Sequence, residues 1–335
     1  LSDRVGREAV MVPGLVLFGL GGVIAGIAPT LLDDPYLLIL LGRVVQGIGA
    51  GGTYQIALAL AGDIFQSEER SKAMGLLEAA NGLGKVVSPI IGSAAALIAW
   101  FAPFFVYPLL AWPSALGVAL LVPEPGRKKR AGYGSGLVEV FKKKGPSLAA
   151  SFLAALVVLF LLFGVLSFFS DILETRYGIK GFIKGFVIAV PVLVMAVTSW
   201  LSGTVMQKKK TTWLKALVVG GLVMMGAAVL GVYLLRDIVL LTGATAVMGL
   251  GNGLILPALN TFITSAAGSS GRGAVTALYG TVRFLGAATG PPVFGLAFEV
   301  GALPVFAAGL VLVALAAVLA GLFMNQRGDV VPSTK

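Results

Sequence analysis

The chain has no cysteine and no histidine, and only 12% of its 335 residues are charged. Without these two residue types, disulfides, thiol chemistry and the usual protein metal sites are excluded, and no cofactor is expected. The shortage of charge excludes an ordinary soluble domain, in which about 25% of residues are charged. Because 57% of the residues are hydrophobic and mean hydropathy is +0.96, we expect an integral membrane protein.

Long apolar stretches recur along the whole chain. A helix of about 20 apolar residues crosses a ~30 Å hydrocarbon core, and stretches of this length occur ten times. The fold class is therefore predicted as all-α, with ten transmembrane helices and no signal peptide in residues 1–8. We expect the helices near residues 9–30, 36–60, 73–97, 102–122, 147–170, 183–205, 213–235, 238–264, 274–298 and 302–324.

The net charge of +10 is unevenly placed. With the first loop assigned to the cytoplasm, 18 of the 25 lysines and arginines fall in loops on that side and four fall on the other. This asymmetry follows the positive-inside rule, so the basic charge orients a multi-pass protein in a cytoplasmic membrane, with both ends inside. Basic clusters beside helices also attract anionic lipid headgroups, and no nucleic-acid partner is needed to explain them.

An internal repeat indicates two related helical bundles. The segment 43–52, RVVQGIGAGG, aligns with the segment 245–254, TAVMGLGNGL, at an offset of 202 residues. At the same offset Arg70 matches Arg272, Gly84 matches Gly286 and Pro89 matches Pro291. The helices near 147–170 and 183–205 would then have counterparts upstream of Leu1, so we expect a complete chain to carry two further helices.

The expected organisation is therefore four helices followed by six. Residues 1–123 form an incomplete N-terminal bundle, and residues 124–146 form a linker with the basic runs RKKR and KKK on the cytoplasmic side. Residues 147–325 form a six-helix bundle, and residues 326–335 form a cytoplasmic tail.

Three motifs resemble signatures of the major facilitator superfamily. Leu1, Ser2, Asp3, Arg4, Gly6 and Arg7 match G-x-L-[SA]-D-R-x-G-R without its leading glycine, and Arg43, Gln46, Gly47 and Gly49 match R-x-x-Q-G-x-G. Gly75, Gly84, Pro89 and Gly92 fit the antiporter pattern G(x8)G(x3)GP(x2)GG, in which Ser88 and Ser93 replace two glycines. The resemblance implies the major facilitator fold of two pseudo-repeat helical bundles, and its third motif is similar to that of drug:proton antiporters.

Arg43 is expected about two turns into an apolar helix, where burying its charge costs at least ~2.5 kcal/mol. It should therefore face the bundle interior and a partner, and the resemblance implies a role in proton coupling with Gln46. The alternative is an anchor that reaches the interface. Because histidine is absent, the proton carrier must be an acid, and Glu78 is the acid expected within a helix, or at its cytoplasmic end.

A polar stripe is expected on the helix near 73–97. Glu78, Asn81, Lys85, Ser88 and Gly92 are spaced by three and four residues, so they share one helix face that should line a cavity. Arg283 stands at the repeat position of Asn81. Asn81, Lys85 and Arg283, with Asn252 and Asn260, form the predicted substrate cavity, and its excess of cations favours an anionic or zwitterionic substrate.

The opening loop is expected to act as a cytoplasmic gate. Asp3, Arg4 and Arg7 can form ion pairs with Asp63, and Arg70 belongs to the same basic face. The alternative is a surface ion pair that contributes ~0 to 1 kcal/mol.

The predicted function is secondary active transport of a small organic solute by alternating access, as proton-coupled, multidrug-type efflux by a monomer. The alternatives are proton-coupled uptake of an organic anion or other metabolite, and a non-transporting membrane scaffold. A membrane enzyme is disfavoured because no grouping of acid, histidine or cysteine suited to catalysis is apparent.

Overall fold

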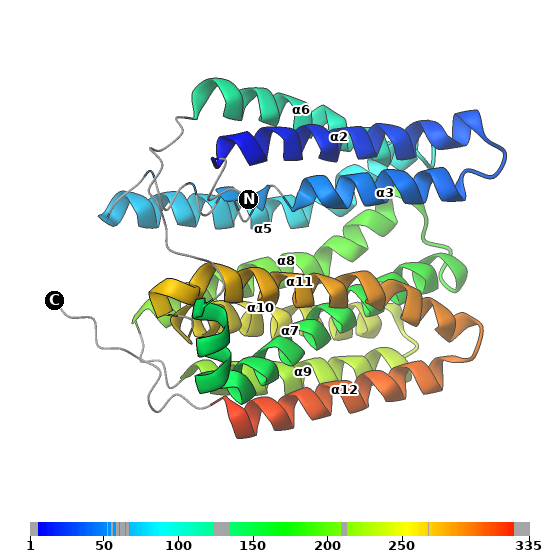
Figure 1. Ribbon diagram of the computed structural model, residues 1–335. Coiled ribbons are helices and arrows are strands. Elements are labelled where there is room, and N and C mark those ends of the chain that lie inside the picture. Colours follow the sequence, from blue (N-terminus) through cyan, green and yellow to red (C-terminus); the bar gives the residue numbers. More distant parts are fainter. Residues whose placement is uncertain are drawn as a thin grey trace. The chain divides into compact units, whose positions relative to one another are not determined.

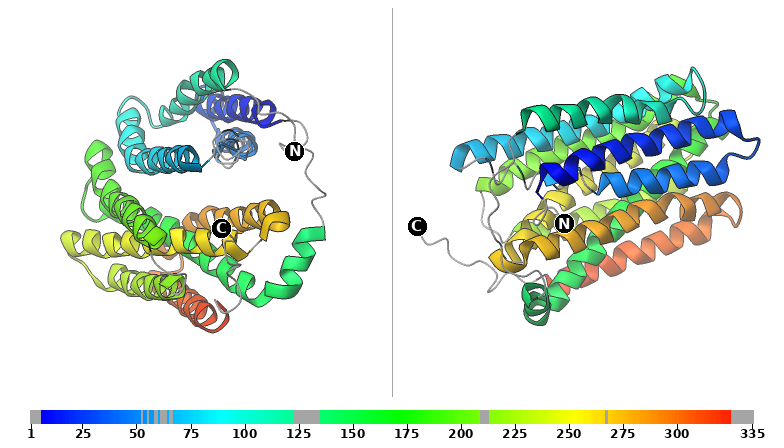
Figure 2. Two further views of the ribbon diagram at one scale, coloured as in Figure 1. Left: turned by 90° about the vertical axis from the view of Figure 1, so that its left-hand side faces the viewer. Right: turned by 45° about the horizontal axis from the view of Figure 1, so that its top comes forward.

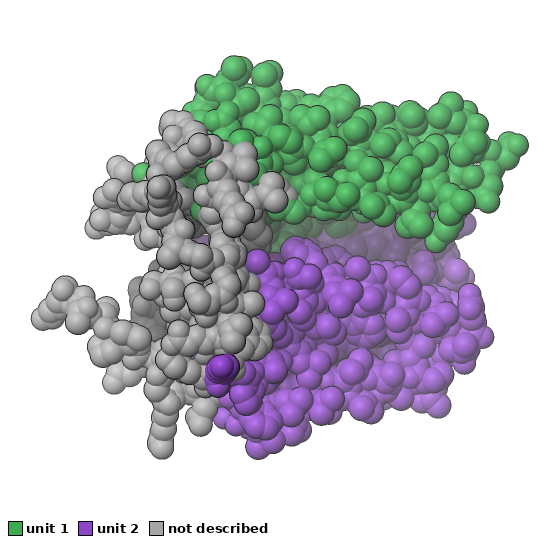
Figure 3. All heavy atoms as spheres, in the orientation of Figure 1, with its two compact units in different colours: residues 1–130 green, residues 131–335 purple. Residues whose placement is uncertain are grey.

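The computed structural model divides into two compact units, residues 1–130 and residues 131–335, which Figure 3 colours separately. The structure describes residues 6–51, 53–54, 56–57, 60, 64, 67–122, 135–208, 213–266 and 268–324. Within the helices, the side chains of some residues are not described: 67–76, 78–79, 135–141, 143, 204–208, 264–266 and 268–274. The described residues contain ten α-helices and one short 3₁₀ helix.

Unit 1 contains four of these helices, α2 (Glu8–Leu31), α3 (Tyr36–Ala50), α5 (Ser67–Ala96) and α6 (Pro103–Leu121). Helix α2 packs between α3 and α6, as Figure 1 shows. Glycines let α2 and α3 approach closely: a Cβ atom on Gly21 would lie 2.5 Å from the carbonyl oxygen of Gly42. Small residues at such contacts are typical of membrane helices, whose association depends on packing rather than on the hydrophobic effect.

The expected helix 36–60 is interrupted. Helix α3 ends at Ala50, in the glycine-rich run from Gly49 to Gly52, and Thr53 accepts hydrogen bonds from the backbone N–H groups of Ile56 and Ala57. Glycine is the least favourable residue in a helix interior apart from proline, by about 1 kcal/mol relative to alanine. The apolar composition continues through this run, so hydropathy alone did not indicate the break that the glycines favour.

Unit 2 contains α7 (Ser135–Thr175), α8 (Gly181–Lys208), α9 (Trp213–Leu234), α10 (Ile238–Ala266), α11 (Gly268–Gly295), the 3₁₀ helix η1 (Leu296–Phe298) and α12 (Ala302–Phe323). Helix α11 packs on α7, α10 packs on α8 and α9, and α12 packs on α9 and α7 (Figure 2). Helix α7 is kinked at Lys144, so a separate helical segment precedes it within the region expected as a linker. Phe169, Phe294 and Phe306 are among the largest fully buried side chains of this unit.

Seven of the described helices are long and apolar enough to cross a membrane: α2, α6, α8, α9, α10, α12 and the part of α7 from Lys144 to Thr175. Helix α3 is apolar but short, whereas α5 and α11 are long but carry charged and small polar residues. Helices α5 and α11 hold predicted site residues, and polar residues in a spanning helix are tolerated where the helix lines a cavity or packs on protein.

The repeat is visible in the packing of α3 and α10. Gly49 of α3 packs against the backbone of Phe18 on α2, and its repeat counterpart Gly251 on α10 would place a Cβ 2.8 Å from the carbonyl oxygen of Gly221 on α9. The pair α2 and α3 thus corresponds to the pair α9 and α10. The same glycine position makes the close contact in both units.

The two units differ at the other repeated glycines. Gly249 packs on the Pro191 carbonyl of α8, and Gly286 packs on the Leu156 carbonyl of α7. Among the described residues, no heavy atom lies within 4 Å of a Cβ added to their counterparts in unit 1, Gly47 and Gly84. The described part of unit 1 contains no helix in the positions that α7 and α8 take in unit 2.

Candidate functional site

Arg43 and Gln46 form the best-defined polar contact of unit 1. They lie one turn apart on α3, and the Arg43 guanidinium donates a hydrogen bond to the side-chain oxygen of Gln46. Gln46 is 3% exposed, and its buried side-chain nitrogen has no hydrogen-bond partner in the part of the chain that the structure describes. The cation therefore has a neutral partner on its own helix, and the proton-coupling role of the two residues stays a prediction.

Tyr107 completes this site from another helix. The guanidinium carbon of Arg43 lies 5.5 Å from the centre of the Tyr107 ring on α6, and that ring makes an edge-to-face contact with Phe18 on α2. A cation over an aromatic face is attracted by the ring quadrupole. Arg43 is thus positioned by α3 and α6 together. The sequence did not predict Tyr107, because nothing in its local pattern links it to α3.

The polar stripe of α5 is helical as expected. Asn81 is half-buried and Lys85 is exposed, and the Ser88 hydroxyl donates to the Lys85 carbonyl oxygen at 3.3 Å. Pro89 lies inside the helix, and Gly84 and Gly92 both face open space. The side chain of Glu78 lies outside the described residues, as do the surroundings of Gly75.

Most of the predicted gate also lies outside the described residues. This applies to Asp3, Arg4 and Asp63 and to the side chain of Arg70. Arg7 is half-buried and directly precedes α2, and its carbonyl oxygen accepts the N–H of Met11 at 3.0 Å. Gly6 has a φ angle of 123°, which a residue with a side chain rarely adopts, so glycine is needed for this turn.

Arg283 on α11 is surrounded by aromatic rings. Its guanidinium carbon lies 5.6 Å from the ring centre of Tyr279 and 5.1 Å from that of Phe284, and its Nε has no hydrogen-bond partner among the described residues. Tyr279 is 3% exposed and lies against Phe152 of α7, with ring centres 6.0 Å apart. Arg283 is therefore held by its own helix and keeps hydrogen-bonding capacity.

Two further hydroxyl groups on α11 lack partners. The Tyr279 hydroxyl and the Thr276 hydroxyl are both buried, and neither makes a hydrogen bond within the described residues. With Arg283 they are spaced by three and four residues, so all three lie on one side of the helix. Neither residue was predicted from the sequence, although this spacing from Arg283 was a usable signal.

The two predicted asparagines of α10 differ in their surroundings. Asn252 is fully buried, and neither its side-chain oxygen nor its nitrogen has a hydrogen-bond partner among the described residues. Asn260 is half-buried. An unsatisfied buried amide costs about 1 to 3 kcal/mol, so Asn252 is a group that water or a ligand would stabilise.

Comparison with known proteins identifies the family. The sequence profile described as Major Facilitator Superfamily matches residues 1–291. The chain belongs to this superfamily. The predicted resemblance is thereby confirmed, and this is a family of membrane transporters rather than of enzymes.

Two curated relatives in the superfamily are bacterial. The Bacillibactin exporter of Bacillus subtilis (strain 168) is 37% identical over 300 residues, which cover 88% of this chain and 74% of that protein. Multidrug resistance protein MdtL of Escherichia coli (strain UTI89 / UPEC) is 33% identical over 123 residues, or 36% of this chain and 29% of that protein.

Solved structures show the same superfamily fold. A bacterial homolog of the human lysosomal transporter Spinster, in an inward-facing and occupied conformation, has a TM-score of 0.77 at 19% identity and covers 99% of this chain and 86% of that one. The human organic anion transporter MFSD10 has a TM-score of 0.68 at 22% identity, and the match covers 95% of this chain and 78% of that one. At these identities the likeness concerns the fold alone. The all-helical, multi-pass membrane class predicted from composition is confirmed.

Proposed function

We propose that the chain is a secondary active transporter that exports a small organic solute in exchange for protons, by alternating access. The direction is supported by the names of its relatives, a Bacillibactin exporter and a multidrug resistance protein. Proton coupling requires a charge inside the helices whose free energy changes when a proton binds to a nearby acid. Binding of the proton can then favour one conformation, because an equilibrium shifts only when its two states differ in free energy of binding.

The observation that carries the proposal is the contact between Arg43 and Gln46. A cation in an apolar helix is held by a neutral amide and an aromatic ring rather than by an acid of the described residues. Its charge therefore remains available to an acid that titrates during transport. Glu78 on α5 is the acid that we assign to this role, since it is the acid expected within a helix of the N-terminal half.

Arg283 favours an anionic or zwitterionic group on the solute. Its Nε has no partner among the described residues, and planar guanidinium groups bind carboxylates through two parallel hydrogen bonds. Lys85, Asn81, Asn252 and Asn260 complete the proposed cavity. The same cations would also serve proton-coupled uptake of an organic anion, which is the second candidate function.

The proposal includes an arrangement of four spans followed by six. Residues 124–146 join the two bundles, and both ends of the chain lie in the cytoplasm of a monomer. Asp3, Arg4 and Arg7 close the cytoplasmic side through Asp63 and Arg70. Surface ion pairs of this kind contribute little free energy, so they can form in one conformation and break in the other.

The test is transport into inside-out membrane vesicles that contain the protein and carry an inwardly acidic pH gradient. Bacillibactin, salicylate and ethidium serve as probes of different charge. We expect accumulation of at least one anionic probe, its loss on addition of a protonophore, and its loss in Arg43→Ala. Leu41→Ala, an exposed neighbour on α3, is the matched control. Accumulation that persists after the gradient has collapsed contradicts proton coupling, and absence of all transport favours a scaffold.

A further inference from the structure

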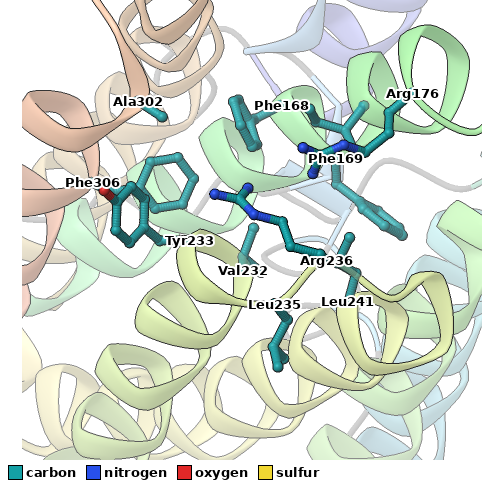
Figure 4. A pocket seen from close by; sticks show the side chains of 11 residues that line it. Phe168, Phe169, Arg176, Val232, Tyr233, Leu235, Arg236, Leu241, Ala302 and Phe306 are labelled. Atoms are coloured by element: carbon teal, nitrogen blue, oxygen red, sulfur yellow. The ribbon is translucent and has the colours of Figure 1, made fainter.

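A pocket lies at one end of unit 2, and none of the predicted cavity residues is among its lining. It is formed where α7 and α9 end and where α10 and α12 begin, and Figure 4 shows its lining side chains. Its lining comprises Phe168, Phe169, Ile172, Arg176, Val232, Tyr233, Leu235, Arg236, Leu241, Ala302 and Phe306. The charge pattern of the sequence predicts that this end faces the outside.

The inner wall of the pocket is a packed aromatic cluster. Phe306 is 1% exposed, and its ring centre lies 5.0 Å from that of Phe168 in an edge-to-face arrangement and 5.7 Å from that of Tyr233. Phe168 also stacks on Phe298 at 5.1 Å, and Phe306 contacts Phe294 at 5.4 Å. These packed rings form the rigid base of the pocket, and the half-buried side chains of Tyr233 and Ala302 are the apolar lining that a ligand can reach without first having to be ordered.

Two arginines supply positive charge to the pocket. Arg176 follows α7 and Arg236 lies between α9 and α10, and both guanidinium groups point towards the aromatic rings in Figure 4. None of the described residues that line the pocket is acidic. In the described part of the chain, neither arginine side chain makes an ion pair or a hydrogen bond.

Two acids close in sequence to these arginines interact with other groups. Glu174 binds Lys184 at 2.9 Å and lies 3.9 Å from Lys180. Asp237 accepts the backbone N–H groups of Val239 and Leu240 at 2.9 and 3.1 Å, at the start of α10. The positive charge of the pocket is therefore not compensated by these two neighbours.

The segments that carry the arginines are tied to each other. The Tyr177 hydroxyl donates a hydrogen bond to the backbone carbonyl oxygen of Arg236, which joins the end of α7 to the connection between α9 and α10. Gly178 has a φ angle of 67°, and this turn lets the N–H of Ile179 donate a hydrogen bond to the Leu173 carbonyl oxygen at 2.8 Å. Both arginines thus project from fixed backbone.

We propose that this pocket binds the anionic group of a small organic acid between Arg176 and Arg236, with the apolar part of the acid against Tyr233 and Ala302. Two guanidinium groups suit a carboxylate or phosphate, since each presents paired donors in a plane. The site is separate from the predicted transport cavity and does not depend on proton coupling. The same chemistry would accept the headgroup of an anionic phospholipid, because this end is expected at the membrane surface.

The experiment uses the purified protein in nanodiscs of phosphatidylcholine and measures 2-naphthoate binding by isothermal titration calorimetry. Arg176→Gln and Arg236→Gln should each weaken binding roughly tenfold or more, as expected for loss of a charge-assisted hydrogen bond. The double variant should not bind measurably. The neutral amide 2-naphthamide should not bind the unaltered protein, since it lacks the charge that the arginines recognise.

Lys180→Gln is the matched control, because Lys180 lies at the same end, has a 69% exposed side chain and does not line the pocket. It should leave binding unchanged. Nanodiscs that contain phosphatidylglycerol identify the natural source of the anion: competition with 2-naphthoate indicates a lipid headgroup, and undiminished binding indicates a soluble acid. Both results support the site.

The proposal is overturned if the double variant binds 2-naphthoate as the unaltered protein does, or if neither lipid composition supports binding. It is also overturned if Arg283→Ala removes binding while the pocket variants retain it, because the acid then occupies the transport cavity. Failure of proton coupling in the vesicle experiment would leave these binding results unaffected, so the two proposals fail separately.

Discussion

The guanidinium of Arg43 donates a hydrogen bond to the buried side-chain oxygen of Gln46, one turn along the same helix. Gln46 in turn lies in the close contact between α2 and α3, where a Cβ on Gly21 would approach its backbone nitrogen to 2.5 Å. The orientation of a functional cation is thereby linked to the packing of two helices. A change in that packing would move the charge.

Arg43→Lys should impair coupling more than it impairs folding. Lysine keeps the charge but lacks the planar fork that binds Gln46 and stacks over Tyr107, and such replacements are not conservative at stacked sites. We expect proton-driven transport to fall by an order of magnitude or more, since about 1.4 kcal/mol corresponds to a factor of ten. The thermal unfolding temperature should be close to that of the unaltered protein. Equal transport rates for both proteins would contradict the role of the Arg43 contacts.

The sequence predicted those features of the fold whose signal lies within a single segment of the chain. The apolar stretch at 213–235 appears as α9, Trp213–Leu234, because in lipid a helix is the structure that satisfies its own backbone groups. The spacing of Arg43 and Gln46 likewise places them one turn apart on one helix, where side chains can meet. These features need no knowledge of other helices.

Contacts between distant segments could not be predicted in this way. Tyr107 reaches Arg43 from α6, and Phe152 reaches Tyr279 from α7, across many residues of intervening chain. Neither pairing has a spacing signature. The arginine pocket was missed for the same reason, since it combines residues from four helices and their connections.

Gly286→Ala should destabilise the protein, and Gly84→Ala should not. An added Cβ at Gly286 would overlap the backbone carbonyl of Leu156, which cannot move without shifting α7. Overpacking of this kind typically costs about 1 to 3 kcal/mol. Gly84 faces open space, where alanine gains about 1 kcal/mol in helix propensity. The measurement is the thermal unfolding of residues 1–335 in detergent. A loss of stability in Gly84→Ala as large as that in Gly286→Ala would show that the Gly84 face is covered.

Phe306→Ala should strongly destabilise unit 2. The ring is fully buried and contacts Phe168, Tyr233 and Phe294, so its removal leaves a cavity among three rings. Such changes cost about 3 to 5 kcal/mol. Leu303→Ala, one turn earlier on α12 and 62% exposed, is the control and should have a small effect. Unfolding monitored by tryptophan fluorescence in detergent distinguishes the two. Similar midpoints for both variants would indicate that the aromatic cluster contributes little.

Arg283→Ala and Lys85→Ala should reduce transport of an anionic solute and spare that of a cationic one. Arg283 keeps an unpartnered Nε beside two aromatic rings, so its charge is available to a carboxylate within the proposed cavity. Its removal should raise the KM for salicylate about tenfold, which corresponds to one lost charge-assisted hydrogen bond. Ethidium transport, measured in the same vesicles, should be unchanged or faster because a repelling charge is gone. Lys180→Gln, at an exposed position of unit 2 outside the pocket lining, serves as the charge-matched control and should leave the KM for salicylate unchanged. If Arg283→Ala and Lys85→Ala transport salicylate with an unaltered KM, the cations of α5 and α11 do not select the solute, and the preference for anions must be abandoned.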